Sequence, residues 1–191
     1  CARCPGLPLE PARVGAADRL DRDGNAVRAT LRFFAKYGLL VAARQVGLAR
    51  AAFDIARDYC DIRKSFGKPI GHFQAVAFTL ADRHMDAESA RELCRRAAWS
   101  WDSGKDEQKS LLYSAQAIAH SHEAAMRCGD DAVQLHGGAG FMRDVIVEKM
   151  MRDAKQIALC GLTAEHADQL AAAVELDAPL GLHLALLADH L

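Results

Sequence analysis

The stretch RKSFGKPIGHFQ, residues 63–74, divides this chain of 191 residues into two parts with different roles. It begins with cations and contains Gly67 and Pro69, and glycine and proline commonly end one helix and redirect the chain. Apolar and small residues recur at spacings of three and four before this stretch, and again from Phe73 to Leu80. We therefore predict a polar turn that joins two long helices.

Residues 12–178 contain only one proline, Pro69, and are rich in alanine, leucine, arginine, glutamate and glutamine. This favours an all-α, up-and-down four-helix-type bundle that follows an irregular lead-in. Gly47, within the first helical segment, is expected to allow close approach of a neighbouring helix. The expected divisions are a lead-in over 1–24, a bundle over 25–178 and a helical extension over 179–191, and the expected helices span about 25–60, 71–101, 107–135, 145–157 and 163–175.

The composition excludes several classes of function. Lys and Arg number 24 against 25 Asp and Glu, so neither a nucleic-acid partner nor an anionic membrane partner is expected. No apolar run approaches the roughly 20 residues that span a bilayer, and a cytoplasmic protein is expected. The six cysteines form a single CxxC, Cys1 and Cys4, with no second pair, so no metal site is predicted.

Three further strings carry more specific information: VGLA at residues 46–49, QLHGGAGF at residues 134–141 and VEKMMRDAK at residues 147–155. Together with residues 63–74, their order and spacing resemble the C-terminal helical domain of the acyl-CoA dehydrogenase family over roughly residues 27–175. The resemblance implies a helical bundle that contacts FAD. It also implies that the charged residues near Arg152 form structural ion pairs.

The resemblance assigns cofactor contacts to particular residues. It implies that Arg63, Phe66 and Gln74 lie against an FAD bound mainly by a neighbouring subunit. A guanidinium suits that role because it can donate two hydrogen bonds to phosphate oxygens. Without the resemblance, Arg63 would be interpreted as a solvated cation and Phe66 as a core side chain.

The resemblance adds a glycine turn and a second segment to the cofactor site. The glycine turn, Gln134 with Gly137 and Gly138, would let the backbone approach the diphosphate and adenosine side of the FAD. The second segment follows the predicted helix of residues 145–157, where Thr163 and Glu165 match cofactor-contacting positions of the family.

The family's reaction also needs a carboxylate that removes the α-proton of an acyl thioester while hydride leaves to the flavin. The two positions at which the family places this carboxylate correspond here to Gly161 and Tyr37. A tyrosine, whose ordinary pKa is about 10, is a poor base at neutral pH. The catalytic base is therefore unidentified.

Several functions stay open at this point. The leading interpretation is an FAD-dependent acyl-CoA or acyl-carrier thioester dehydrogenase, present as a fragment or a base-deficient subunit, with FAD shared across a homo- or hetero-oligomer. Residues 1–24 would then be the tail of a missing β-domain. The alternatives are a non-catalytic subunit that completes a partner's FAD site and a flavin-dependent oxidase or hydroxylase. The acyl chain length and the electron acceptor are not specified by the sequence.

Overall fold

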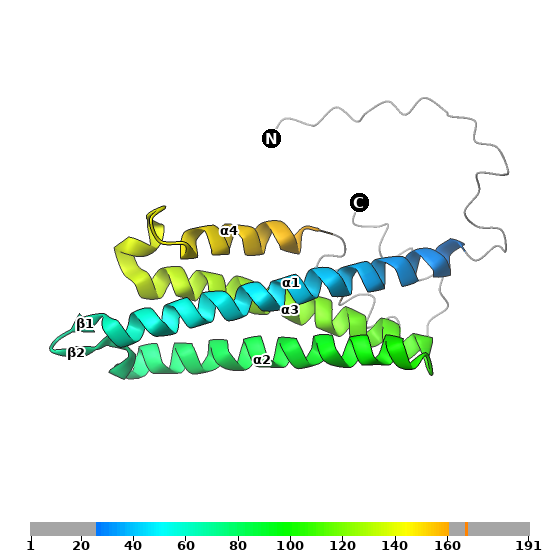
Figure 1. The fold of residues 1–191 in the computed structure, drawn as a ribbon, viewed down its shortest axis with the longest axis horizontal. Helices are drawn as coiled ribbons and strands as arrows, with labels where there is room; N and C mark the ends of the chain where they lie inside the picture. The colour runs from blue at the N-terminus through cyan, green and yellow to red at the C-terminus, as the bar shows by residue number, and fades with distance from the viewer. Residues whose placement is uncertain (1–25, 161–166, 168–191) are drawn as a thin grey trace, which may run out of the picture.

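The chain folds as a bundle of long helices in a computed structural model that describes residues 26–160 and residue 167. Within these residues, α1 (Ala26–Ile62), α2 (Gln74–Ser103) and α3 (Glu107–His136) lie side by side, and the shorter α4 (Val147–Ala158) packs on α1 and α3 (Figure 1). Strands β1 (Lys64–Ser65) and β2 (Lys68–Pro69) and the 3-10 helices η2 (Ile70–His72) and η3 (Gly137–Phe141) connect them. The all-α fold predicted from the sequence is confirmed.

The helix boundaries follow the predicted ones closely, with one difference. We expected the second helix to begin near Gly71, whereas η2 occupies this region and α2 begins at Gln74. The helix predicted over 163–175 and the helical extension predicted over 179–191 lie outside the described residues, apart from Ala167, which is buried against Leu31 and Ile118. The divisions at residues 24 and 178 also lie outside the described residues and stay predictions.

The contact between α1 and α3 is built from small side chains. The two helices run in the same direction, and α2 runs back between their ends (Figure 1). Small side chains let helix axes approach closely and leave little room for added atoms. The buried residues that α1 and α3 contribute to one core cluster are Ala49, Ala52, Ala56, Ala125, Cys128, Ala132 and Val133.

The glycines at which neighbouring helices approach each other closely are not the one predicted. Gly47 is exposed, and an added Cβ would meet no atom within 4 Å, so its predicted role in helix packing is wrong. A Cβ on Gly38 would overlap the Ile118 side chain, and a Cβ on Gly129 would lie 3.0 Å from the Cα of Met151 in α4. Helical periodicity identified Gly47 but could not show which face of the helix it occupies.

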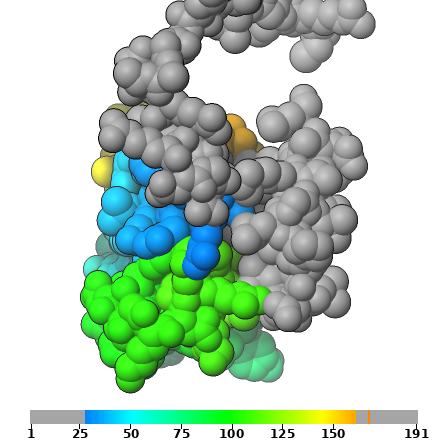
Figure 2. All heavy atoms as spheres, turned by 90° about the vertical axis from the view of Figure 1, so that its right-hand side faces the viewer, coloured from blue at the N-terminus to red at the C-terminus, as the bar shows by residue number. Residues whose placement is uncertain are grey.

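The turn between α2 and α3 is fixed by a left-handed glycine and a helix cap. Gly104 ends α2 with a φ of 62°, and the Asp106 carboxylate accepts a hydrogen bond of 3.0 Å from the backbone N–H of Lys109. Buried Ser100 and Ser110 hydroxyls bond each other at 2.8 Å. Figure 2 shows this end of the molecule, where the start of α1 lies beside the turn and Arg28 pairs with Glu107.

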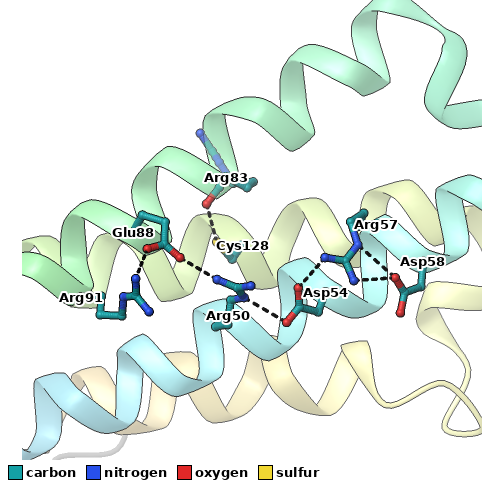
Figure 3. Close-up of polar contacts among 8 residues, drawn as sticks. All are labelled: Arg50, Asp54, Arg57, Asp58, Arg83, Glu88, Arg91 and Cys128. Carbon is teal, nitrogen blue, oxygen red and sulfur yellow. Dashed lines mark hydrogen bonds and ion pairs between the residues drawn. The ribbon is translucent and has the colours of Figure 1, made fainter.

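Ion pairs cover the surface on which α1 meets α2. Arg50 bonds Asp54 at 3.0 Å on its own helix and Glu88 at 2.6 Å on α2, and Arg57 continues the row to Asp54 (Figure 3). Because these side chains are 30–44% exposed and reach solvent, each pair contributes only about 0–1 kcal/mol.

A similar row lies on α4, in the segment whose charges were predicted to be structural. Arg152 bonds Glu148 at 2.8 Å, and Lys149 pairs with Asp153. The prediction of structural ion pairs in this segment is confirmed. No helix in the described ranges is long and apolar enough to cross a membrane.

A first prediction concerns Gly140, which is buried in η3. A Cβ on this residue would overlap the carbonyl oxygen of Val133, a backbone atom that cannot rotate away. Gly140→Ala should therefore lower the free energy of unfolding by about 1–3 kcal/mol, as measured by denaturant titration. Gly138→Ala is the matched control, because a Cβ there would meet no atom within 4 Å. Equal stability of the two variants would contradict this packing.

A second prediction concerns His122, which is 2% exposed on α3. Burial lowers the pKa of its imidazole below the ordinary 6.5, so the unfolded chain binds a proton more readily than the folded chain. The stability that this histidine contributes is complete above pH 6.5 and is lost as the pH falls through the folded pKa.

Unfolding titrations at several pH values check this expectation. His122→Gln should reduce the loss of unfolding free energy below pH 6.5. The control, Ser121→Ala, alters a buried neighbour of His122 that does not titrate and should keep the wild-type slope. An unchanged slope in His122→Gln would show that another group dominates the acid response.

Candidate functional site

The predicted polar turn forms a tight hairpin. Strands β1 and β2 are antiparallel, with Lys64 opposite Pro69 and Ser65 opposite Lys68. Phe66 and Gly67 occupy the tip with φ values of 51° and 81°. Two-residue hairpins of this kind need a positive φ, which glycine adopts freely and which costs another residue about 1–2 kcal/mol.

The hairpin is anchored where it leaves α1. The Ile70 N–H donates to the carbonyl oxygen of Arg63 at 2.8 Å, and the Arg63 N–H donates to Tyr59 at 2.9 Å. These backbone bonds hold the base of the hairpin against the last turn of α1. The sequence predicted the turn, but it did not predict the strand pairing, which involves only two residues on each side.

Phe66 projects from the tip and is 93% exposed. Among the described residues, its ring makes an edge contact with the ring of Phe73, with the ring centroids 6.3 Å apart. The interpretation of Phe66 as a core side chain is therefore wrong. A large apolar side chain held outward by a strained backbone contributes little to this fold, and such residues are typical of binding sites.

The second part of the site is the glycine turn at the end of α3. Gly137 has φ 59° and ψ −137°, a conformation that favours glycine, and its N–H donates to the Gln134 carbonyl oxygen. The buried His136 ring stacks on Tyr59 with the centroids 4.1 Å apart, and its Nδ1 donates to Ala132 at 2.7 Å. This stack connects the last turn of α1 to the glycine turn.

His136 was not singled out from the sequence, although it stands between the helix and the glycine pair. Because α1 and α3 run in the same direction, the hairpin that follows α1 and the glycine turn that follows α3 lie at the same end of the bundle (Figure 1). Nothing in the local pattern indicates the contact between His136 and Tyr59, since it depends on that helix arrangement.

A groove of about 470 Å³ lies where the hairpin, the first turns of α2 and the end of α3 meet. Two residues predicted for the site, Phe66 and Gln134, line it together. Its walls are mostly apolar, which suits a flat organic group. The full lining consists of Ser65, Phe66, Ile70, Phe73, Ala75, Val76, Thr79, Gln134 and Leu135.

The other predicted residues adjoin the groove without lining it. Gln74 is exposed at the start of α2, between two lining residues, and Arg63 is exposed two residues before Ser65. Gly137 and Gly138 are exposed just beyond Leu135. Sequence reasoning missed Phe73, Val76 and Thr79 as site residues, although the first two were expected on the apolar face of the second helix.

The hairpin carries uncompensated positive charge. Arg63, Lys64 and Lys68 are exposed, and none of them forms an ion pair with another residue in the described ranges. The Lys68 ammonium lies 4.4 Å from the centroid of the Phe73 ring, a cation–π contact. Aromatic walls beside free cations fit a ligand that combines a planar ring with phosphate groups.

Tyr37, which occupies one of the family's base positions, lies elsewhere in the fold. It is 42% exposed on α1 and stacks on Phe33, with the ring centroids 6.1 Å apart and the planes at 2°. It precedes Arg63 by 26 residues along α1, which corresponds to roughly 40 Å at 1.5 Å per residue. Tyr37 and the hairpin therefore lie far apart in the chain's fold.

Three other predicted residues, Gly161, Thr163 and Glu165, lie outside the described residues. Residue 161, the position that corresponds to the family's usual base, follows Cys160, which lies two residues after the end of α4. Within the described ranges, no group of three His, Cys, Asp or Glu residues is placed to hold a metal ion.

Comparison with known proteins establishes the family. The family profile described as the acyl-CoA dehydrogenase C-terminal domain matches residues 27–173. The chain belongs to the acyl-CoA dehydrogenase family. This family is FAD-dependent, and its match covers the described elements from the second residue of α1 onward.

Individual relatives agree with this membership. The chain is 38% identical over 157 residues to YngJ of Bacillus subtilis, named a probable acyl-CoA dehydrogenase, covering 82% of this chain and 40% of that protein. It is also 38% identical over 149 residues to the cyclohex-1-ene-1-carbonyl-CoA dehydrogenase of Geobacter metallireducens, covering 78% and 39%.

A solved structure shows the same similarity in three dimensions. The butyryl-CoA dehydrogenase of Megasphaera elsdenii matches with a TM-score of 0.78 and 32% identity, covering 85% of this chain and 42% of that one. The chain thus spans about two fifths of the length of these relatives, 40% of YngJ and 39% of the Geobacter metallireducens enzyme.

The hairpin yields a third prediction. Phe66→Gly removes an exposed ring and relieves a φ of 51°, so the free energy of unfolding should stay the same or rise by up to about 1 kcal/mol. Denaturant titration measures this change, and Phe73→Gly, at a half-buried position, is the contrasting variant that should destabilise. A clear loss of stability in Phe66→Gly would show that Phe66 serves the fold.

Proposed function

We propose that this chain is the flavin-contacting helical part of an FAD-dependent dehydrogenase that acts on acyl-CoA or acyl-carrier thioesters. Its groove would receive the adenosine diphosphate end of an FAD held mainly by a neighbouring subunit. The observation that carries the proposal is the convergence of Phe66, Gln134 and the free cations of the hairpin at one end of the bundle.

The residues present fit this group of the cofactor. The groove offers the aromatic rings of Phe66 and Phe73 for contact with a planar base. The Gln134 amide can both donate and accept hydrogen bonds. The exposed Arg63 guanidinium can bind a phosphate through two parallel hydrogen bonds. Gly137 presents backbone without a side chain to an approaching diphosphate.

The distance between the hairpin and Tyr37 supports the sharing of FAD between subunits. One chain would contact a partner's cofactor through its hairpin while its own acyl site lies some 40 Å along α1. When bound, FAD supplies the hydride acceptor of α,β-dehydrogenation. Removal of the α-proton requires a carboxylate from outside the positions of Tyr37 and Gly161.

A second candidate function, a non-catalytic subunit, is favoured by the residues at positions 37 and 161. In a non-catalytic subunit, the bundle would complete a partner's FAD site and no base would be needed, which agrees with glycine and tyrosine at residues 161 and 37. A flavin-dependent oxidase or hydroxylase also needs no α-proton base. The dehydrogenase, the completing subunit and the oxidase share the same prediction for the hairpin, and they differ in turnover of an acyl thioester.

The cofactor assignment is tested by FAD binding. A chimera would carry residues 27–173 in place of the matching segment of the Megasphaera elsdenii butyryl-CoA dehydrogenase, and the 191-residue chain would be tested alone. Arg63→Ala in the chimera should weaken FAD binding about 10- to 100-fold, because a hydrogen bond to a charged group contributes roughly 1.5–3 kcal/mol. Arg63→Lys should recover part of the loss.

The control is Arg44→Ala, which removes another exposed cation of α1 away from the hairpin. It should leave FAD binding unchanged in fluorescence titrations. FAD affinity that falls equally in Arg44→Ala and Arg63→Ala would contradict the proposed site. Acyl-thioester turnover by the chimera would favour the dehydrogenase, and FAD binding without turnover would favour the completing subunit.

A further inference from the structure

Thr79 brings a hydroxyl group into the apolar part of the groove. It lines the groove from the second turn of α2, together with Val76 and with Leu135 near the end of α3. The Thr79 side chain is half-buried, and its Oγ1 donates a 3.0 Å hydrogen bond to the carbonyl oxygen of Ala75, four residues earlier. A hydroxyl has one proton to donate and two lone pairs that can accept. While its proton is held by Ala75, Thr79 can only accept a hydrogen bond from a ligand in the groove.

The groove has a charged end and an apolar end. The exposed cations of the hairpin stand at the charged end, where the Lys68 ammonium lies 4.4 Å from the centroid of the Phe73 ring. Helix α2 runs away from the hairpin (Figure 1), and Thr79 follows Phe73 by six residues, which is about 9 Å at 1.5 Å per residue. A nucleoside diphosphate has the same polarity, with its phosphates at one end and its base at the other. The phosphates would meet the hairpin, and the edge of the base would reach Thr79.

The other two polar side chains of the groove lining do not select between donors and acceptors at this end. The Gln134 amide carries both a carbonyl oxygen and an NH2 group, so it can turn to suit either kind of ligand atom. Ser65 belongs to strand β1, at the charged end. Thr79 is therefore the lining residue whose hydrogen-bonding role toward a base is fixed in advance by the helix itself.

We propose that Thr79 determines the base specificity of the groove by accepting a hydrogen bond from the 6-amino group of a purine. Adenine has an N–H donor at this position, whereas guanine and hypoxanthine have a carbonyl oxygen, which only accepts. A 6-oxo purine would bring this oxygen against the Thr79 lone pairs unless the hydroxyl turned and gave up its bond to Ala75. Either way one neutral hydrogen bond is lost, which corresponds to about 3- to 10-fold in affinity. The inference rests on the proposed function and specifies which base the groove accepts.

Three variants of the full 191-residue chain test this role. Thr79→Val keeps the branched shape of the side chain and removes the hydroxyl. Thr79→Ser keeps the hydroxyl and the possibility of its bond to Ala75. Ser89→Ala is the matched control, because Ser89 makes the same kind of bond to the carbonyl oxygen of Met85, at 2.7 Å, farther along α2 and outside the groove lining.

The readout is the ratio of the dissociation constants of inosine diphosphate and adenosine diphosphate, measured by titration calorimetry. These ligands share the ribose and the diphosphate and differ in the six-membered ring of the base. The wild-type chain, Thr79→Ser and Ser89→Ala should bind adenosine diphosphate about 3- to 10-fold more tightly than inosine diphosphate. Thr79→Val should bring the ratio near 1 by weakening the binding of adenosine diphosphate. A general change in stability would affect both ligands alike and leave the ratio unchanged.

The outcomes separate this inference from the proposed function. A ratio near 1 in the wild-type chain, a wild-type ratio in Thr79→Val, or an equal fall of the ratio in Ser89→Ala would overturn the specificity role, while the binding of both nucleotides would leave the proposed function standing. Failure of both nucleotides to bind at millimolar concentration would contradict the proposed function and the specificity role together.

Discussion

The close, same-direction packing of α1 against α3 is the constraint on which the rest of the structure depends. Alanines such as Ala52 and Ala132 form this interface, and Gly38 meets Ile118 where no Cβ could be accommodated without movement. Since the helices run the same way, whatever follows α1 and whatever follows α3 must emerge at the same end (Figure 1). The hairpin and the glycine turn are neighbours for this reason.

This arrangement also leaves two features far apart on α1. The end of α1 holds a cationic hairpin beside an apolar groove, whereas Tyr37 lies many turns earlier and stacks on Phe33. The chain belongs to the acyl-CoA dehydrogenase family, which is FAD-dependent. Because the two places are far apart, the lack of a carboxylate at residue 37 does not alter the groove.

The sequence was sufficient to predict the helices because strong local signals mark their ends. Gly104 and the Asp106 cap stop and restart the chain, and Gly137 ends α3, so these boundaries are encoded within a few residues. The hairpin strands were not predictable in the same way, since a positive φ at Phe66 is an unusual state that no propensity indicates. The packing role predicted for Gly47 was wrong because periodicity does not identify which face of a helix is buried.

The candidate site residues were predicted on a different basis from the helices. Phe66 and Gln134 came from motif resemblance, and the structure places both in one groove. Thr79 and His136 were missed because their positions depend on how α2 and α3 pack, which is information that no local pattern contains.

The central claim is that the joined ends of α1 and α3 form one site for the adenosine diphosphate end of FAD. The most direct test is a titration of the chain with adenosine diphosphate, followed through the methyl resonances of valine and leucine. Saturable shifts of Val76 and Leu135, which line the groove, with no shift of Val41 or Leu111, which lie in the core, are the predicted result. Shifts confined to residues outside the groove, or none at millimolar ligand, would contradict the claim.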